Sequence, residues 1–179
     1  MKVVQFTIPV AANNSIHLQE DRLPHFYGQL HRHAEIQITS VLAGTGTLLA
    51  GNHMQQFAGG EVFVIGANQP HLFKSDPAYF EKGSRKMIHS LNLFFKPSGF
   101  IDPLLQLPEM SRIKKWMAVA AHGLQAAPNA AQKITQALQT VNVAANGKRM
   151  AAFILLLQLL ADSKKWQPFS TDAFTHNFT

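Results

Sequence analysis

Short alternating runs of polar and apolar residues, separated by glycine and proline, fill the first hundred residues of this chain. Runs of this kind are typical of β-strands joined by tight turns. Beyond residue 100 the texture changes to long alanine- and leucine-rich stretches in which apolar residues recur at helical spacing. A chain divided in this way is expected to fold as a mainly β part followed by a helical part.

Turn residues separate six expected strands in the β part. These strands span residues 30–42, 45–50, 53–57, 61–65, 71–74 and 88–95. Gly51 and Asn52 form a two-residue hairpin turn, in which glycine tolerates a positive φ angle. Six or more short antiparallel strands with regular turn spacing favour a sandwich or a small barrel.

Three helices are expected in the second part, over about residues 108–122, 130–144 and 147–163. Pro108 suits the first turn of a helix, and Gly123 suits its end. The third helix carries a stripe of large apolar residues, which Ile154 widens. This stripe consists of Phe153, Leu156, Leu157 and Leu160. An apolar surface of this width must pack on the barrel or on another chain.

Composition excludes several classes of protein. A length of 179 residues suits one domain with a real core, and the absence of cysteine excludes disulfide scaffolds, thiolate metal sites and cysteine nucleophiles. The start lacks the apolar core of a secretory signal. The longest apolar stretch, residues 150–161, is interrupted by Gln158 and is too short to span a bilayer. The expected location is therefore the cytoplasm, without a membrane partner.

The net charge of +6 is unevenly distributed along the chain. Residues 1–71 hold three lysines and arginines against four acidic residues, whereas residues 72–179 hold thirteen against six. The basic residues of the second part occur in scattered pairs rather than in one block. Solvated helix faces explain such pairs better than a nucleic-acid footprint does, so this chain alone is not expected to bind DNA.

A polar row begins the first expected strand. Alternation places the side chains of one set of residues on the same face: His31, His33, Glu35, Gln37 and Thr39. The opposite face carries Ala34, Ile36, Ile38 and Leu42. The polar face therefore meets water, or it lines a cavity in which polar groups converge on a ligand or a metal.

Two motifs around this row resemble those of the cupin family. The spacing His31-x-His33-x3-Gln37-x6-Gly44 is similar to the first cupin motif, and Gly60-x5-Gly66-x-Asn68-x2-His71 is similar to the second. In metal-binding cupins, the corresponding positions hold a divalent metal inside a jelly-roll barrel. Here the resemblance implies His31, His33, His71 and position 37 as ligands.

The sequence departs from the cupin pattern at three positions. Gln37 replaces the usual glutamate, Gly66 the usual proline, and Asn68 the usual glycine. Three imidazoles can still hold Zn²⁺, Fe²⁺, Ni²⁺ or Cu²⁺, although loss of the carboxylate lowers affinity for harder ions. The alternative is that these histidines form hydrogen bonds in a polar pocket.

A longer stretch resembles the sensing domain of AraC/XylS-family transcriptional regulators. The match runs over about residues 20–76, with a His-x-His entry, an "EI" strand, a G-x-G turn and the segment Gly60–His71. Residues 155–160 more loosely resemble the last helix before the family's DNA-binding region. The resemblance implies a cupin-like jelly-roll barrel (a double-stranded β-helix) that binds an effector beside an N-terminal arm. It also implies helices that mediate dimerisation.

The family also implies a following DNA-binding region of two helix-turn-helix motifs, about a hundred residues long. Only fourteen residues follow Lys165 in this sequence. We expect either a sensor fragment of a longer regulator or a natural single-domain relative, and the polar, irregular tail favours the fragment.

These expectations combine into one organisation. We expect a cupin-like barrel with an N-terminal arm at residues 1–100, a helical dimerisation part at 101–166 and a linker-like tail at 167–179. The expected ligand is a small polar metabolite such as a sugar. The residues expected to bind it are His31, His33, Glu35, Gln37, His71 and Phe73.

The chain is not expected to be an enzyme. The alternative is a metal-dependent cupin enzyme, a dioxygenase or an isomerase, which uses His31, His33 and His71. A stand-alone binding module without a DNA partner is a third possibility.

Overall fold

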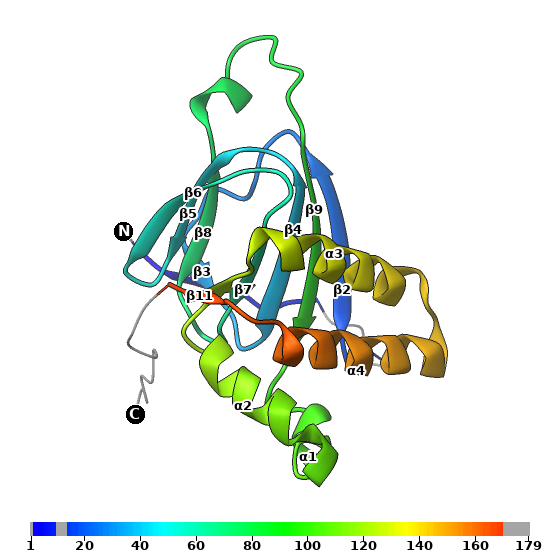
Figure 1. Ribbon diagram of the computed structural model, residues 1–179. Helices are drawn as coiled ribbons and strands as arrows, with labels where there is room; N and C mark the ends of the chain where they lie inside the picture. Colours follow the sequence, from blue (N-terminus) through cyan, green and yellow to red (C-terminus); the bar gives the residue numbers. More distant parts are fainter. Residues whose placement is uncertain (1, 10–13, 170–179) are drawn as a thin grey trace.

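The computed structural model describes residues 2–9 and 14–169, which form two β-sheets and a set of helices (Figure 1). In strand order, the first sheet consists of β1 (Val4–Gln5), β3 (His31–Arg32), β8 (His71–Ser75), β5 (Gly46–Ala50) and β6 (His53–Phe57). The second consists of β11 (Gln167–Pro168), β10 (Leu124–Gln125), β7 (Val62–Ile65), β4 (Ile36–Ala43), β9 (Ile88–Phe95) and β2 (His17–Leu23). Apart from the parallel pair β1–β3, neighbouring strands are antiparallel. The predicted mainly β jelly-roll barrel followed by helices is confirmed.

The tight turns of the barrel depend on glycine. Gly51 has a φ of 62° at the hairpin between β5 and β6, a conformation that other residues rarely adopt. A side chain at Gly46 would collide with the Lys74 carbonyl and the Phe57 ring, because β5 and β8 lie close together there. The predicted strands 53–57, 61–65, 71–74 and 88–95 form nearly where expected.

The single strand expected over residues 30–42 is wrong. The chain forms β3 in the first sheet, bends over residues 33–35 and continues as β4 in the second sheet. The Asn68 N–H donates a 2.7 Å hydrogen bond to the His33 carbonyl at this bend, which removes that carbonyl from strand pairing. His31 and Gln37 consequently approach the barrel interior from two different sheets rather than along one face.

Four strands of the structure are absent from the prediction: β1, β2, β10 and β11. The longest of them, β2, pairs along its whole length with β9, from His17 opposite Phe94 to Leu23 opposite Ile88. Its sequence is mostly polar because it lies at the sheet edge and leaves many side chains in solvent. The apolar alternation that reveals a strand in sequence is therefore weak there.

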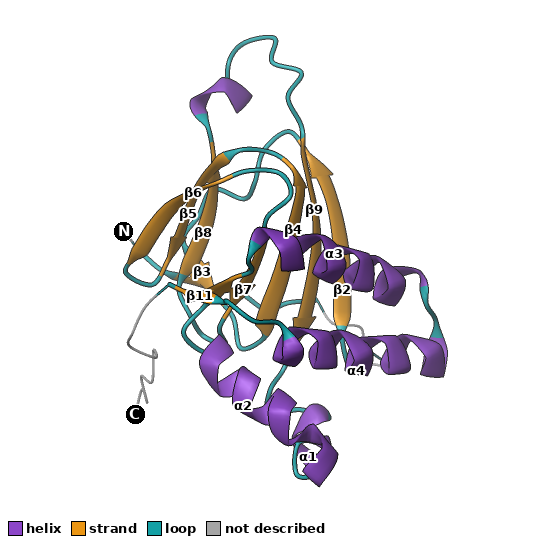
Figure 2. Cartoon of the chain, in the orientation of Figure 1, coloured by secondary structure: helices purple, strands orange, loops and turns teal. Residues whose placement is uncertain are grey.

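The helices lie beside the second sheet (Figure 2). They are α1 (Ile101–Leu104), α2 (Ser111–Ala120), α3 (Pro128–Val143) and α4 (Asn146–Asp162), with single 3-10 turns at Pro77–Tyr79 and Pro108–Met110. Alternate residues of β4 and β9, such as Ile38 and Leu93, form one core with the helices. Ser40 Oγ also lies 2.8 Å from Thr135 Oγ1 of α3.

The apolar stripe predicted on the third helix is fully buried in α4. Its four members, Phe153, Leu156, Leu157 and Leu160, are all 0% exposed. They belong to the core shared with the second sheet, and the centroid of the Phe153 ring lies 5.1 Å from that of Phe95 of β9. Of the two packing partners expected for this surface, the barrel of the same chain is the one observed.

The other side of the second sheet faces the barrel interior. A second apolar cluster fills one end of that interior, with Val41 from β4 and Phe63 from β7 opposite Leu48 and Phe73 from the first sheet. Polar side chains of β4 and β9 lie farther along the same interior face. Across the described residues, no helix has the length and apolarity needed to cross a membrane.

Candidate functional site

An open cavity of about 430 Å³ lies between the two sheets. Its lining residues are Phe6, Thr7, Ile8, Pro9, Gln19, Asp21, Leu23, Phe26, Tyr27, His31, Gln37, His71, Phe73, Ile88, Asn92 and Phe94. The volume lies within the range usual for small-molecule sites. Residues 6–9, from the segment before β2, are among these lining residues.

Three histidines converge at one end of this cavity. His31 comes from β3, His33 from the bend that follows, and His71 from the start of β8, where it pairs with His31. One ring nitrogen from each lies within 4.8 Å of the others. The bend between the two sheets therefore brings together residues that the sequence places two and forty positions apart.

Each of these rings has one nitrogen held by a backbone carbonyl. The Nδ1 atoms of His31, His33 and His71 lie 2.8, 3.1 and 2.8 Å from the carbonyl oxygens of residues 29, 35 and 69. A carbonyl only accepts hydrogen bonds, so each Nδ1 carries the proton and each neutral ring presents a lone pair on Nε2. This arrangement is the one that metal-binding histidines usually adopt.

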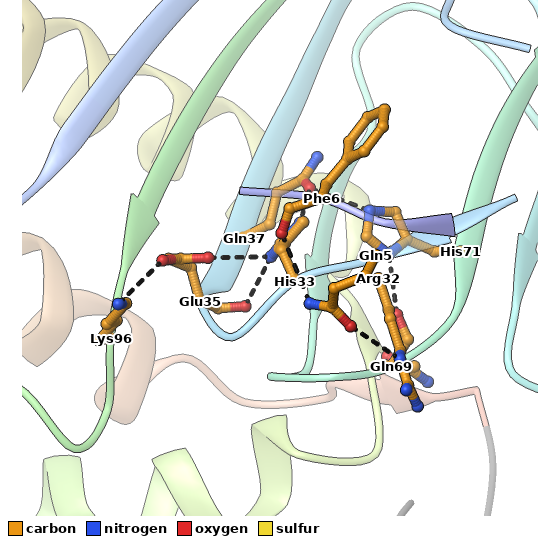
Figure 3. A network of polar contacts seen from close by, with 9 residues as sticks. All are labelled: Gln5, Phe6, Arg32, His33, Glu35, Gln37, Gln69, His71 and Lys96. Carbon is orange, nitrogen blue, oxygen red and sulfur yellow. Dashed lines mark hydrogen bonds and ion pairs between the residues drawn. The ribbon is translucent and has the colours of Figure 1, made fainter. Parts of the chain in front are cut away.

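The Gln37 side chain lies between two of these Nε2 atoms (Figure 3). Its Oε1 is 3.0 Å from His33 Nε2 and 3.1 Å from His71 Nε2. Its Nε2 donates instead to Thr39 Oγ1 at 2.8 Å. Oε1 therefore faces two ring nitrogens that have no proton to donate, and a cation bound among these atoms would satisfy all of them.

Burial keeps the three rings neutral. It lowers the pKa of His31 and of His33 below the ordinary value, and it lowers the pKa of the fully buried His71 well below that value. The neighbouring rings lower the pKa of His71 further, since each charged ring would repel the next. A neutral imidazole with a free lone pair is the form that binds a metal.

The predicted site residues divide into three groups. His31, Gln37, His71 and Phe73 line the cavity. His33 is buried behind the lining and belongs to the histidine cluster. The Glu35 carboxylate lies 3.6 Å from His33 Nδ1 and 3.9 Å from Lys96 Nζ (Figure 3). Glu35 does not line the cavity.

Several polar residues of the cavity lining are absent from the predicted set, among them Gln19, Asp21 and Asn92. Gln19 and Asp21 lie on β2, which was not predicted as a strand, and Asn92 lies in the apolar strand β9. An asparagine flanked by Leu91 and Leu93 inside such a strand is a signal that the sequence does contain. Asn92 is only 6% exposed, and a buried amide requires polar partners.

The donor set fits a divalent metal. Three imidazole nitrogens and one amide oxygen suit Zn²⁺ and other transition-metal ions, and each ring has the carbonyl partner that orients a ligand. The lack of a carboxylate makes the set poorer for Mg²⁺ and Ca²⁺, which prefer oxygen ligands.

This chain is similar to known proteins both in sequence and in structure. The profile of the AraC-like ligand binding domain matches residues 13–165. A comparison with curated proteins gives no match. Among solved structures, a cupin protein from Bacteroides fragilis has a TM-score of 0.40 and 15% identity, and the match covers 53% of this chain and 84% of that one.

Two structures of ToxT from Vibrio cholerae are also similar. The first has a TM-score of 0.45 and 12% identity, over 90% of this chain and 61% of that chain. The second, described as wild-type ToxT bound to an unsaturated fatty acid, has a TM-score of 0.47 and 12% identity, over 83% and 53%. The match thus spans between about half and three fifths of the ToxT chains.

Proposed function

Because this chain belongs to the family of AraC-like ligand-binding domains, we propose that it is the effector-sensing domain of an AraC-type transcriptional regulator. The observation that carries the proposal is the cavity of about 430 Å³ between the two sheets. It has the size of a small-molecule site, and polar side chains converge at one end. The effector would bind inside the barrel, beside the segment that contains Phe6 and Ile8.

Four of the predicted residues line the cavity and would contact the effector directly: His31, Gln37, His71 and Phe73. His33 and Glu35 would act behind them. His33 Nε2 lies 3.0 Å from Gln37 Oε1 on its buried side, and the Glu35 carbonyl accepts a hydrogen bond from Nδ1 of the His33 ring. The proposed site is therefore a set of contact residues supported by a buried layer.

The effector proposed from the sequence is a small polar metabolite such as a sugar. Amide, carboxylate and imidazole groups of the lining would bind hydroxyl groups, with Gln19, Asp21 and Asn92 added to the predicted set. The lining also includes apolar rings such as Phe26 and Phe94, which suit the C–H face of a sugar ring. A polar molecule with one apolar face would fit both kinds of lining residue.

Regulation would require a second state of the molecule. An effector that binds one arrangement of the N-terminal segment and barrel better than another shifts the population toward it. DNA would be bound by a helix-turn-helix region outside this sequence, in the cytoplasm. The helical part would form a homodimer, for which exposed apolar residues such as Leu155 and Val143, 70% and 83% exposed, are available. Sedimentation that shows only monomer at micromolar concentration would contradict the dimer.

A thermal-unfolding screen tests the sensing function. A sugar and metabolite panel is expected to contain a ligand that stabilises the domain, by about 2.7 kcal/mol at a hundred times its Kd. Leu23→Trp should remove this stabilisation, because Leu23 lines the cavity at its exposed side and a larger side chain fills it. Met54→Trp is the control, since Met54 is 68% exposed and lies outside the cavity lining.

Two outcomes would contradict the sensing function. One is a broad panel that leaves the unfolding temperature of the wild type unchanged. The other is a ligand that stabilises the Leu23→Trp variant as much as the wild type, because such a ligand binds elsewhere.

The histidine cluster favours one further candidate, a divalent metal with or without cupin-type enzyme activity. His31, His33, His71 and Gln37 would hold the ion, which would supply a Lewis acid at the end of the cavity. Elemental analysis of protein purified without a histidine tag measures the metal directly. We expect a bound metal that His71→Ala removes.

Elemental analysis, together with an assay for turnover, also distinguishes a metal-dependent enzyme from a sensing domain. Protein that stays metal-free after incubation with Zn²⁺ would contradict both the metal and a metal-dependent dioxygenase or isomerase. A bound metal without turnover of small-molecule substrates would be consistent with a sensing domain that uses the metal to bind its effector.

A further inference from the structure

A glutamine amide at position 37 can point either of its two ends at the histidine cluster, and the two orientations would give the cluster opposite properties. With Nε2 toward the rings, the amide donates one hydrogen bond to each Nε2 lone pair, and the cluster is satisfied without a cation. With Oε1 toward the rings, the cluster presents only electron-pair donors. The orientation must therefore be fixed by the hydrogen-bond partners at the end of the Gln37 amide that points away from the histidines.

A chain of hydrogen bonds on that side ends at a carboxylate. Gln37 Nε2 donates to Thr39 Oγ1 at 2.8 Å, and Thr39 Oγ1 donates to Asn92 Oδ1 at 2.8 Å. Asn92 Nδ2 in turn donates to Asp21 Oδ2 at 3.0 Å. Gln19 Nε2 donates to the other oxygen of the Asp21 carboxylate at 2.7 Å.

The Asp21 carboxylate sets the direction of every hydrogen bond in this series. An ionised carboxylate accepts hydrogen bonds only, so Asn92 must turn its amide nitrogen toward Asp21 and its oxygen toward Thr39. The Thr39 proton then points to Asn92, which leaves the hydroxyl oxygen to accept from Gln37. Gln37 must donate to it, and its Oε1 therefore faces His33 and His71.

Burial makes the order strict. Thr39, Gln37 and Asn92 are 1%, 7% and 6% exposed, so reversing one member would leave an unsatisfied polar group that little water can reach. The strand register supports the same path, because Thr39 lies opposite Asn92 on β9, and Asp21 lies opposite Ser90.

We propose that Asp21, Asn92 and Thr39 are positioning residues that hold Gln37 Oε1 toward the three imidazoles and so make the cluster a site for a divalent transition-metal ion. The inference rests on the metal proposed above as a further candidate. None of the three residues would itself be a ligand of the ion. They act through the direction of the hydrogen bonds.

Zn²⁺ affinity, measured by competition with a chromophoric chelator, tests the inference. Thr39→Val breaks the chain without a change in charge, and we expect a 10- to 100-fold loss of Zn²⁺ affinity, the usual effect of removing an outer-shell partner. Thr39→Ser keeps the hydroxyl and should restore affinity close to that of the wild type. Circular dichroism and the unfolding temperature confirm that each variant is folded.

Asp21→Asn tests the source of the direction, because an amide can donate as well as accept. We expect a loss of Zn²⁺ affinity of similar size. Glu20→Gln is the matched control: Glu20 is the neighbour of Asp21 on β2, and it binds Arg22 and His89 instead of a cavity residue. It removes the same charge and should leave Zn²⁺ affinity within about twofold of the wild type, as screening weakens surface charges.

The outcomes separate the inference from the metal site itself. Wild-type binding of Zn²⁺ with unchanged affinity in Thr39→Val and Asp21→Asn would overturn the positioning role and leave the metal site standing. An equal loss in Glu20→Gln would also overturn it, since charge alone would then explain the effect. A wild type that binds no Zn²⁺ overturns the metal site and the inference together, whereas the sensing function is tested separately by the cavity ligand.

Discussion

At the scale of single residues, the candidate site depends on which atoms donate and which accept. His71 shows this most clearly, because it is 1% exposed and its two ring nitrogens contact a backbone carbonyl and the Gln37 amide. A charged ring at this position would lose its hydration and be repelled by His31 and His33 if they were also charged. The fold therefore requires a neutral imidazole there.

This requirement predicts how stability depends on pH in metal-free protein. The pKa of His71 lies well below 6.5 in the folded chain, so the unfolded chain binds more protons below about pH 6.5. The free energy of unfolding should therefore fall as the pH is lowered from 7.5 to 5 and level off above about 7. Urea unfolding in the presence of EDTA measures it, and His71→Gln should show a shallower fall than the wild type.

His25→Gln is the control for that measurement, because His25 is exposed and lies outside the cluster. This variant should keep the full pH dependence of the wild type. A wild type whose stability is constant between pH 5 and 7.5 would contradict a buried neutral His71.

At the scale of secondary-structure elements, α4 connects the helical part to the barrel. Its buried stripe belongs to the same core as the outward residues of β4 and β9, so the helix contributes to the stability of the sheet that carries Gln37. The exposed side of α4 includes Leu155, which is 70% exposed and makes no comparable contribution within the chain. One helix thus has leucines in two opposite environments.

Leucine-to-alanine variants of α4 measure this difference. Leu157 is 0% exposed, and we expect Leu157→Ala to lower the free energy of unfolding by about 3 kcal/mol through lost burial and a cavity. Leu155→Ala should lower it by less than about 0.5 kcal/mol in the monomer. Urea titration gives both values, and equal effects would mean that α4 does not pack as described.

Part of this organisation could be predicted at the scale of elements, and part could not. Residues 88–95 are rich in large apolar residues and are followed closely by Pro97 and Gly99, and their strand is confirmed with the same limits. The strand 30–42 was predicted as continuous because its alternation is continuous. Its bend depends on the contact between the His33 carbonyl and Asn68, which no local pattern reveals.

At the scale of the whole molecule, the end of the described chain returns to the barrel. The Phe169 N–H donates to the Gly123 carbonyl at 3.0 Å, and the Phe169 ring stacks on His53 with centroids 5.1 Å apart. Phe169 also contacts Phe63, which contacts the cavity residue Phe73. A row of aromatic rings therefore joins the cavity wall to the segment expected to be a linker.

Removal of the Phe169 ring should destabilise the barrel. Phe169 is 6% exposed, and we expect Phe169→Ala to lower the free energy of unfolding by about 3 kcal/mol. Phe80→Ala is the matched control, since Phe80 is 57% exposed, and it should cost less than about 1 kcal/mol. If urea unfolding shows no difference between the two variants, residues 167–169 are not part of the folded barrel.

The sequence by itself determined the fold class, the family and the identity of the three clustered histidines. Alternation, glycine turns and helical spacing are local signals, and His31, His33 and His71 stand within motifs that can be read without coordinates. The Gln37 substitution was also visible, together with the loss of the charged ligand that it implies.

Only the tertiary structure decided how these residues act together. The bend at residues 33–35 moves β4 to the second sheet, and the pairing of β2, β9 and β4 aligns Asp21, Asn92 and Thr39 with Gln37. The direction of the hydrogen bond that Gln37 makes depends on Asp21, at the far end of the series of contacts. Asp21 is 16 positions from Gln37 in sequence and two strands away in the sheet, where no local pattern can reveal it.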